Sequence, residues 1–230
     1  MLIKIIQKSN QLIRQSPIAF LYFSLLSFLF LASTEHINIV SVEAFHHILW
    51  PAYLFIVLWI DMAVIASVLN KENGAISKLD SLFHATIFHS VLHIIMIVIL
   101  TFIVWIPFII VIEVIDLRHI IPLELSFFEA GYNILAMLCV IAVLSQLYVK
   151  PLSTLNQWPL SYRDSFIKLR HSRGYAFLGM LLYLFPAEFI LGFLDVSNYL
   201  LLAILYFLKA YGLFALLSLY KIQVIDKRAT

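Results

Sequence analysis

Six long apolar runs, separated by short polar connections, dominate the pattern of hydrophobic and polar positions along the chain. The runs cover residues 17–33, 48–69, 83–112, 127–149, 175–194 and 199–220. Crossing the hydrocarbon core of a bilayer takes about 20 consecutive apolar residues, and each run is near or above that length. None alternates as a barrel strand does, and backbone groups in lipid must be hydrogen-bonded within the segment, so we expect transmembrane helices.

Two further segments, residues 1–16 and 159–173, are predicted to lie on the membrane surface as amphipathic helices. In the second segment, helical spacing places Tyr162, Phe166 and Leu169 on one face. Basic amphipathic helices of this kind are attracted to the anionic lipids of the cytoplasmic leaflet. Lipid-headgroup contacts are therefore expected from four basic side chains of this segment: Arg163, Lys168, Arg170 and Arg173.

Composition supports the membrane interpretation. The 230 residues are 63% hydrophobic and 12% charged, whereas soluble domains average roughly 45–50% apolar and about 25% charged. A single soluble core of this size could not hide so much apolar surface. The net charge of +2 is too small to indicate nucleic-acid binding, and the single Cys139 excludes an internal disulfide.

The distribution of Lys and Arg predicts the orientation. Of the 15 basic residues, 13 lie in the two terminal segments and in the second-to-third and fourth-to-fifth connections, whereas Arg118 lies in a connection of the opposite side. Basic residues of short loops remain in the cytoplasm, and only an even number of crossings keeps this asymmetry. We therefore expect residues 1–230 to form one all-α transmembrane bundle of six spans, with both termini cytoplasmic.

Ionisable residues within the spans are the candidate functional residues, because each costs at least ~2.5–3.5 kcal/mol at the centre of a membrane helix unless it has a partner. Counting from the span ends places Asp61 and Lys209 at a similar depth in the cytoplasmic half, with Glu188 and Lys209 as the alternative pair. His89 and His93 are four residues apart on one helical face at the same depth. The sequence thus permits one intramembrane polar cluster.

Four interpretations of this cluster remain open. Asp and His are the usual carriers of a proton relay in a transporter. Two His at i and i+4 with an Asp would supply three metal ligands, and haem ligation would need partners on another helix. Polar contacts that hold helices together are the remaining interpretation, and it is the one we favour, with no metal and no cofactor.

Missing motifs argue against an enzyme. The chain has no His-Glu-x-x-His, no Gly-x-Ser-x-Gly and no phosphate-binding glycine loop, which disfavours zinc proteases, serine hydrolases and ATPases. The favoured function is a non-enzymatic structural, assembly or lipid-associated membrane component. A small proton- or ion-coupled transporter or channel subunit is the alternative, and a membrane-embedded lipid-modifying enzyme is third.

The stretch LSQLYVKPLSTLNQWPLSYRDSFIKLRHSRGYAF, residues 144–177, resembles the YciC-like and glycerophosphodiester-phosphodiesterase membrane-domain families. There a span is followed by a short loop and an amphipathic helix, and Ser161, Ser165, Leu169 and Gly174 fall in the corresponding pattern. The family's Pro-Gly-Ile helix break is Pro-Phe-Ile here, at Pro107. The resemblance implies a six-helix bacterial inner-membrane protein without well-defined catalytic residues.

The expected partners follow from the same features. The lipid bilayer and its anionic headgroups come first, and a membrane-protein partner or a second copy of the chain is also possible. Small residues are sparse in the apolar runs, so we expect few close helix contacts of the small-xxx-small kind.

Overall fold

The computed structural model describes residues 1–26, 43–70, 84–115, 125–193 and 199–226, and in these residues every regular element is helical. The all-α prediction is therefore confirmed for the described part of the chain. Apolar residues without period-2 alternation favour helices because each segment then bonds its own backbone groups.

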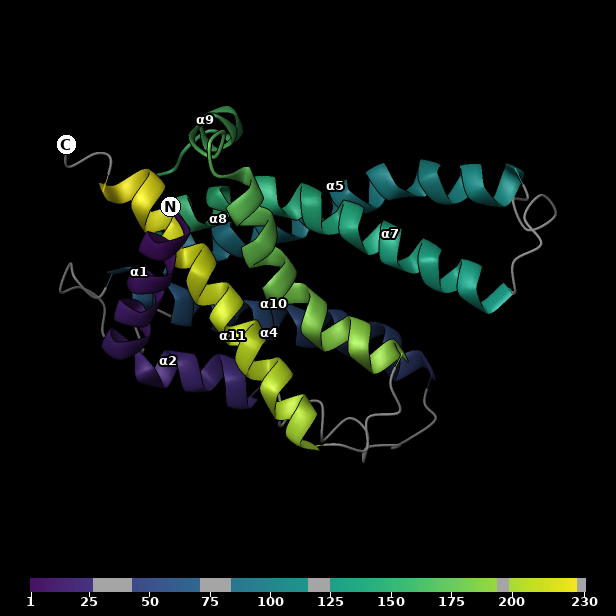
Figure 1. Ribbon diagram of the computed structural model, residues 1–230, viewed down its shortest axis with the longest axis horizontal. Helices are drawn as coiled ribbons and strands as arrows, with labels where there is room; N and C mark the ends of the chain where they lie inside the picture. Colours follow the sequence, from purple (N-terminus) through teal and green to yellow (C-terminus); the bar gives the residue numbers. More distant parts are fainter. Residues whose placement is uncertain (27–42, 71–83, 116–124, 194–198, 227–230) are drawn as a thin grey trace.

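Five long helices form the body of the molecule (Figure 1). They are α4 (Glu43–Asn70), α5 (Ala85–Ile115), α7 (Leu125–Leu147), α10 (Arg173–Phe193) and α11 (Tyr199–Tyr220). Figure 1 shows these helices extending from one common end of the molecule, where both chain termini also lie. The five helices overlap five of the six predicted spans, and residues 27–33 of the first predicted span lie outside the described residues.

Two stretches among the described residues are long and apolar enough to cross a membrane, Met137–Leu155 and Ala203–Ile225. Length and composition alone support this, since a buried core helix of a soluble protein has the same features. Shorter apolar helical stretches cover Phe55–Asn70 and Ala85–Thr101. The structure therefore holds two candidate membrane-spanning helices.

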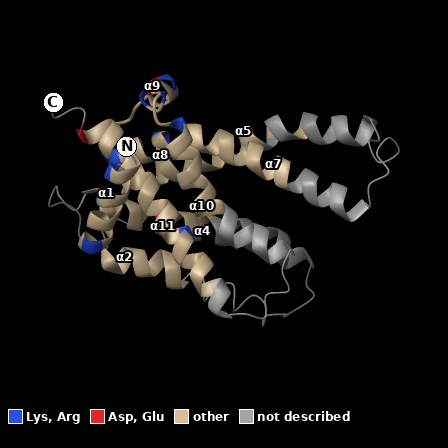
Figure 2. Ribbon diagram, in the orientation of Figure 1, with Lys and Arg blue, Asp and Glu red and all other residues tan. Residues whose placement is uncertain are grey.

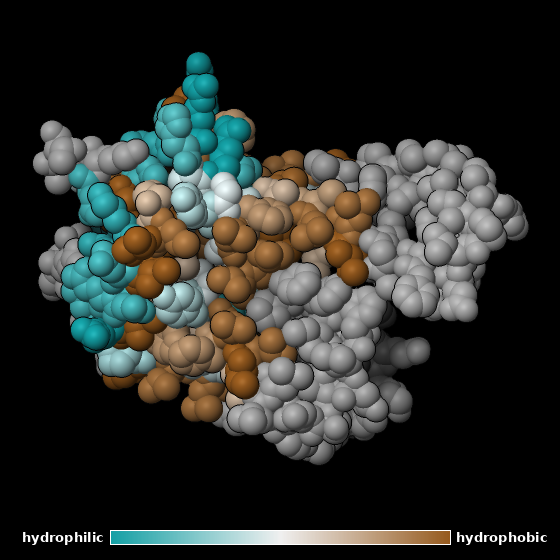
Figure 3. Space-filling view, viewed as in Figure 1, coloured by the Kyte–Doolittle hydropathy of each residue, from teal (hydrophilic) through white to brown (hydrophobic). Residues whose placement is uncertain are grey.

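Short helices gather at the common end, which we call the basic end (Figures 1 and 2). They are α1 (Leu2–Gln15), α8 (Val149–Leu155), α9 (Tyr162–Lys168) and the π-helical turn η4 (Lys221–Ile225). Figure 2 shows the Lys and Arg of the described residues concentrated on these elements. Figure 3 shows the matching hydropathy, with hydrophilic residues over α1 and α9 and hydrophobic residues over the helices that extend away.

Helix α1 packs along α11 at the basic end through its buried face. Ile5, Ser9 and Leu12 are buried there, and Ser9 Oγ donates to Ser218 Oγ of α11 at 3.0 Å. The outer face of α1 exposes bulky apolar residues, with Ile3 at 70%. An N-terminal helix that buries one apolar stripe on the bundle and exposes another is typical of a helix at a membrane interface.

Helices α10 and α11 pack closely at two glycines. A Cβ added to Gly212 would lie 2.6 Å from the Tyr183 backbone nitrogen, and one added to Gly179 would lie 2.9 Å from Leu216 Cδ2. Small residues let helix backbones approach closely when lipid surrounds them. The sequence predicted few contacts of this kind, and α10 with α11 is one of them.

Helix α5 exposes a continuous apolar stripe. Its exposed residues at helical spacing are Phe88, Leu92, Met96, Ile99, Ile103 and Ile106. On a soluble monomer contiguous apolar patches rarely exceed a few hundred Å². An exposed apolar stripe of this kind marks a surface for contact with a membrane, a ligand or another protein.

Candidate functional sites

Asp61 lies on α4 between an exposed and a buried stretch of that helix, and its carboxylate is bonded to another element. Tyr22 Oη donates to Asp61 Oδ1 at 3.1 Å. Tyr22 belongs to the π-helical turn η1 (Tyr22–Leu26), which follows α2 (Pro17–Leu21) and packs against α11. The wide turn of a π-helix often occurs at functional positions, and here it presents a phenol to the carboxylate.

Lys209 of α11 supplies the opposite charge. Its ammonium attracts the Asp61 carboxylate electrostatically. The same Nζ lies 5.8 Å from the ring centroid of Tyr183 on α10 and 5.7 Å from that of Tyr206 on its own helix. A cation over an aromatic ring gains about 0.5–2 kcal/mol, more when it is shielded from water. We call Tyr22, Asp61, Tyr183, Tyr206 and Lys209 the Asp61 cluster.

Of the predicted residues, Asp61 and Lys209 interact electrostatically, whereas both histidines point to other partners. His89 is exposed, and its Nδ1 lies 2.8 Å from the Ala85 carbonyl oxygen of its own helix. His93 Nδ1 lies 3.1 Å from Tyr162 Oη on α9. Glu188 belongs to α10, but its side chain lies outside the described residues.

The three tyrosines of the Asp61 cluster were missed by the sequence analysis, which considered only charged residues and His. A Tyr hydroxyl within an apolar segment needs a hydrogen-bond partner. Tyr22, Tyr183 and Tyr206 each lie in or next to a predicted span. That requirement is the sequence signal that could have directed attention to them.

His93, Lys150 and Tyr162 form a second polar group that attaches α9 to the bundle. Lys150 Nζ donates to the Leu160 carbonyl oxygen at 2.6 Å and lies 5.7 Å from the centroid of the Tyr162 ring. Ser153 Oγ accepts from the Leu160 backbone N–H at 3.1 Å. Burial raises the pKa of the Tyr162 hydroxyl, so this phenol remains protonated at neutral pH. Helix α9 is therefore fixed at its N-terminal side by several hydrogen bonds.

Ser161 caps the N-terminus of α9, and its hydroxyl is also hydrogen-bonded to the acidic residue of the first turn. Ser161 Oγ accepts from the Asp164 backbone N–H at 3.0 Å and donates to Asp164 Oδ2 at 2.7 Å. A side-chain cap of this kind satisfies a free N–H of the first turn. Because the carboxylate of Asp164 is engaged at the cap, the rest of α9 presents mainly positive charge.

The outward face of α9 combines basic and apolar side chains. The exposed residues are Arg163, Phe166 and Ile167 of α9 and Arg170 of the turn that follows the helix, and we call these four residues the α9 stripe. Sequence analysis placed Phe166 on one face with Tyr162 and Leu169. In the structure Leu169 is buried, whereas Phe166 is 44% exposed. Ser165, rather than Phe166, takes the buried position on the bundle.

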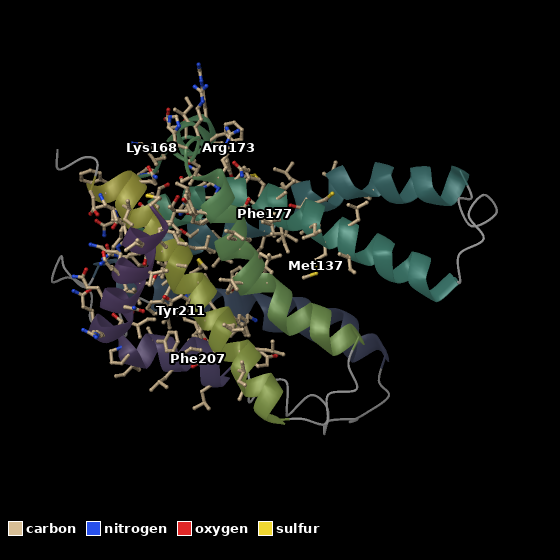
Figure 4. The ribbon with its side chains drawn as sticks, in the orientation of Figure 1. Met137, Lys168, Arg173, Phe177, Phe207 and Tyr211 are labelled. Atoms are coloured by element: carbon tan, nitrogen blue, oxygen red, sulfur yellow. The ribbon has the colours of Figure 1, made fainter. Side chains whose placement is uncertain are left out.

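The other two predicted headgroup contacts lie at the C-terminal side of α9. The Arg173 guanidinium carbon lies 3.9 Å above the Phe166 ring, and Lys168 is half-buried. Figure 4 shows Lys168 and Arg173 together at the basic end, away from Met137 and Phe207. Stacking fixes the plane of the guanidinium, a geometry that suits Arg as a phosphate ligand.

Metal ligation has no cluster to support it in the described part of the chain. Among these residues, no group of three or more His, Cys, Asp or Glu lies close enough to hold an ion. No protein-family model, curated protein or solved structure matches the chain. The resemblance drawn from residues 144–177 therefore stays a prediction.

Proposed function

We propose that the chain is an integral membrane protein of six spans with both termini in the cytoplasm, and that it acts as a non-enzymatic, lipid-associated structural component. The observation that carries this proposal is the α9 stripe, a basic and apolar surface on a helix that is fixed to the bundle. The two candidate membrane-spanning helices and the exposed apolar stripe of α5 support it.

The six-span orientation accounts for the arrangement of the long helices. Helices α1, α8 and α9 and the polar residues between α8 and α10 meet at the basic end (Figure 2). Positive charge is retained on the cytoplasmic side of a membrane. With the basic end in the cytoplasm, α4, α5, α7, α10 and α11 each extend toward the opposite face.

The α9 stripe carries both apolar and basic side chains, which suits it to the cytoplasmic surface of a bilayer. Phe166 and Ile167 are 44% and 56% exposed, which suits insertion at the boundary between headgroups and acyl chains. Arg163 precedes them in α9 and Arg170 follows them in the next turn of the chain, and each contributes about 1 kcal/mol of attraction to anionic lipid. Trp158, 54% exposed in the loop before α9, is a further residue typical of the interface.

Maleimide labelling of the single cysteine tests whether α7 lies in the membrane. Cys139 of α7 is exposed in the structure and lies within the candidate span Met137–Leu155. If lipid covers α7, a membrane-impermeant maleimide should not label Cys139 in inverted vesicles, because no water reaches the thiol to deprotonate it. After denaturation in SDS, labelling should become complete, as measured by the mass shift on a gel.

The matched control moves the cysteine to the basic end. His171, exposed after α9, is replaced in the variant Cys139→Ser/His171→Cys. This thiol should react in inverted vesicles before any denaturation. Equal labelling rates at positions 139 and 171 in intact vesicles would contradict the membrane placement of α7.

A fluorescent probe on the α9 stripe tests the lipid association. In the variant Cys139→Ser/Ile167→Cys, an environment-sensitive dye at position 167 should emit at shorter wavelength in proteoliposomes with anionic phospholipid than in zwitterionic ones. Arg163→Gln/Arg170→Gln should abolish this difference, since about 2 kcal/mol of attraction is removed. Raised salt should also reduce the difference.

The control removes the same charge from another helix. Lys4→Gln/Arg14→Gln changes two basic residues of α1, which is also at the basic end. The dye at position 167 should still distinguish the two lipid compositions in this variant. A water-like emission in both liposomes, with all arginines present, would exclude the proposed contact of α9 with lipid.

A further inference from the structure

The Asp61 cluster joins four elements of the bundle through side chains. Tyr22 comes from η1, Asp61 from α4, Tyr183 from α10, and Tyr206 with Lys209 from α11. The carboxylate accepts the Tyr22 hydroxyl at 3.1 Å, and the ammonium lies within 6 Å of both other ring centroids, at 5.8 and 5.7 Å. A charged pair inside a predicted membrane segment indicates a functional site.

The cluster provides partners for Asp61 in both protonation states. As a carboxylate, Asp61 accepts the Tyr22 proton and attracts Lys209. As a carboxylic acid, it can donate to the phenolic oxygen of Tyr22, because a hydroxyl is both donor and acceptor. The same two residues thus keep their hydrogen bond, with its direction reversed.

Lys209 also has favourable contacts in both states. When Asp61 is ionised, the ammonium is attracted to the carboxylate. When Asp61 is neutral, the faces of Tyr183 and Tyr206 still stabilise the cation.

The described titratable groups of the neighbouring elements do not replace this pair. On α5, His89 directs its Nδ1 to the Ala85 carbonyl oxygen, and His93 directs its Nδ1 to Tyr162. On α8, Lys150 donates to the Leu160 carbonyl oxygen at the basic end. The described contacts from η1, α10 and α11 to Asp61 and Lys209 include those of Tyr22, Tyr183 and Tyr206.

We propose that Asp61 is a reversible proton-binding site inside the bundle, and that proton binding removes the attraction between its carboxylate and Lys209. A proton from water adds to a carboxylate oxygen and gives the neutral acid, while Lys209 keeps its own proton. The attraction between α4 and α11 is then lost, so proton binding alters how these two helices are joined. The proposal does not depend on the lipid contacts of α9.

Infrared difference spectroscopy on the full chain in proteoliposomes tests this site directly. A carboxylic-acid C=O band from a shielded side chain should appear as the pH is lowered from about 9 to about 4. Asp61→Asn should remove the band, and Asp61→Glu should keep it at a shifted frequency. Asp226→Asn, which changes an exposed carboxylate at the end of η4, should leave it unaltered.

Two variants that keep the Asp61 carboxyl make the test independent of how well Asp61→Asn folds. Lys209→Gln should move the midpoint of the band to higher pH by about one unit or more, because an opposite charge at close range favours the ionised form. Tyr22→Phe should move it in the same direction by less. A band that is absent in the natural chain, or a midpoint unmoved by Lys209→Gln, would overturn the proposal.

Discussion

Replacing Gly212 by Ala is expected to lower the free energy of unfolding by about 3 kcal/mol, since overpacking a close contact costs about 1–3 kcal/mol and more where backbone must move. The added Cβ would lie 2.6 Å from the Tyr183 nitrogen and 2.7 Å from the Leu182 carbonyl carbon. Backbone atoms cannot rotate away as a side chain can, so α10 and α11 must separate. SDS-titrated unfolding in mixed micelles, followed by circular dichroism, measures the loss.

Two other glycines of the same hairpin calibrate this result. At Gly179 the added Cβ meets Leu216 Cδ2 at 2.9 Å, and the tip of a flexible side chain can move, so Gly179→Ala should cost about 1 kcal/mol. At Gly174 nothing lies within 4 Å of the added Cβ. Gly174→Ala should therefore be neutral or slightly stabilising, because Ala favours helix by up to about 1 kcal/mol.

Equal effects of the three glycine variants would contradict a close α10–α11 contact at Gly212. The position also bears on the Asp61 cluster, because Tyr183 contributes both the crowded backbone nitrogen and the ring beside Lys209. We therefore expect Gly212→Ala to disturb the lysine as well as the helix pair.

The positions of the long helices could be predicted from the sequence because the length of an apolar run alone decides them. The predicted run 199–220 coincides with α11, and 127–149 differs from α7 by two residues at each end. Ala and Gly content gave no comparable guide to packing. Only the position of a glycine on its helix face, which the structure supplies, shows that Gly212 lies at the contact.

The candidate site could be predicted only in part, because the sequence gives the depth of a residue in its span but not the direction in which its side chain points. Counting residues from the span ends gives depth, and it put Asp61 and Lys209 at a similar depth; in the structure the two interact electrostatically. It does not give the rotation of a helix about its axis, which turns His89 to the outer surface. Nor does it reveal contacts between distant elements, such as the bond of His93 to Tyr162 or of Tyr22 to Asp61.

Truncation of Phe214 is the second substitution for which we expect a large loss of stability. Phe214 of α11 is fully buried and packs edge-to-face on Phe20 of α2, with ring centroids 5.5 Å apart. Truncating a buried Phe to Ala leaves a cavity and costs about 3–5 kcal/mol. Phe214→Ala should therefore lower the free energy of unfolding by about 3 kcal/mol or more in the same SDS titration.

Phe207 provides a control with the same chemistry on the same helix. It also packs edge-to-face on Phe20, with centroids 5.1 Å apart, but it is 52% exposed. Figure 4 shows Phe207 and Tyr211 on α11 beside one another along the helix. Phe207→Ala should cost about 0.5–1.5 kcal/mol, the contribution of the ring pair, since no cavity is left.

Comparing the two variants separates two contributions to the free energy of unfolding: packing between helices and the transfer of apolar surface out of water. In a bilayer the exposed face of Phe207 meets acyl chains whether or not the helices are assembled, so little transfer energy is lost with it. Phe214 instead fills space between helices, and that space stays empty when the ring is removed. If Phe207→Ala cost as much as Phe214→Ala, the exposed face of α11 would have to be covered by protein rather than by lipid.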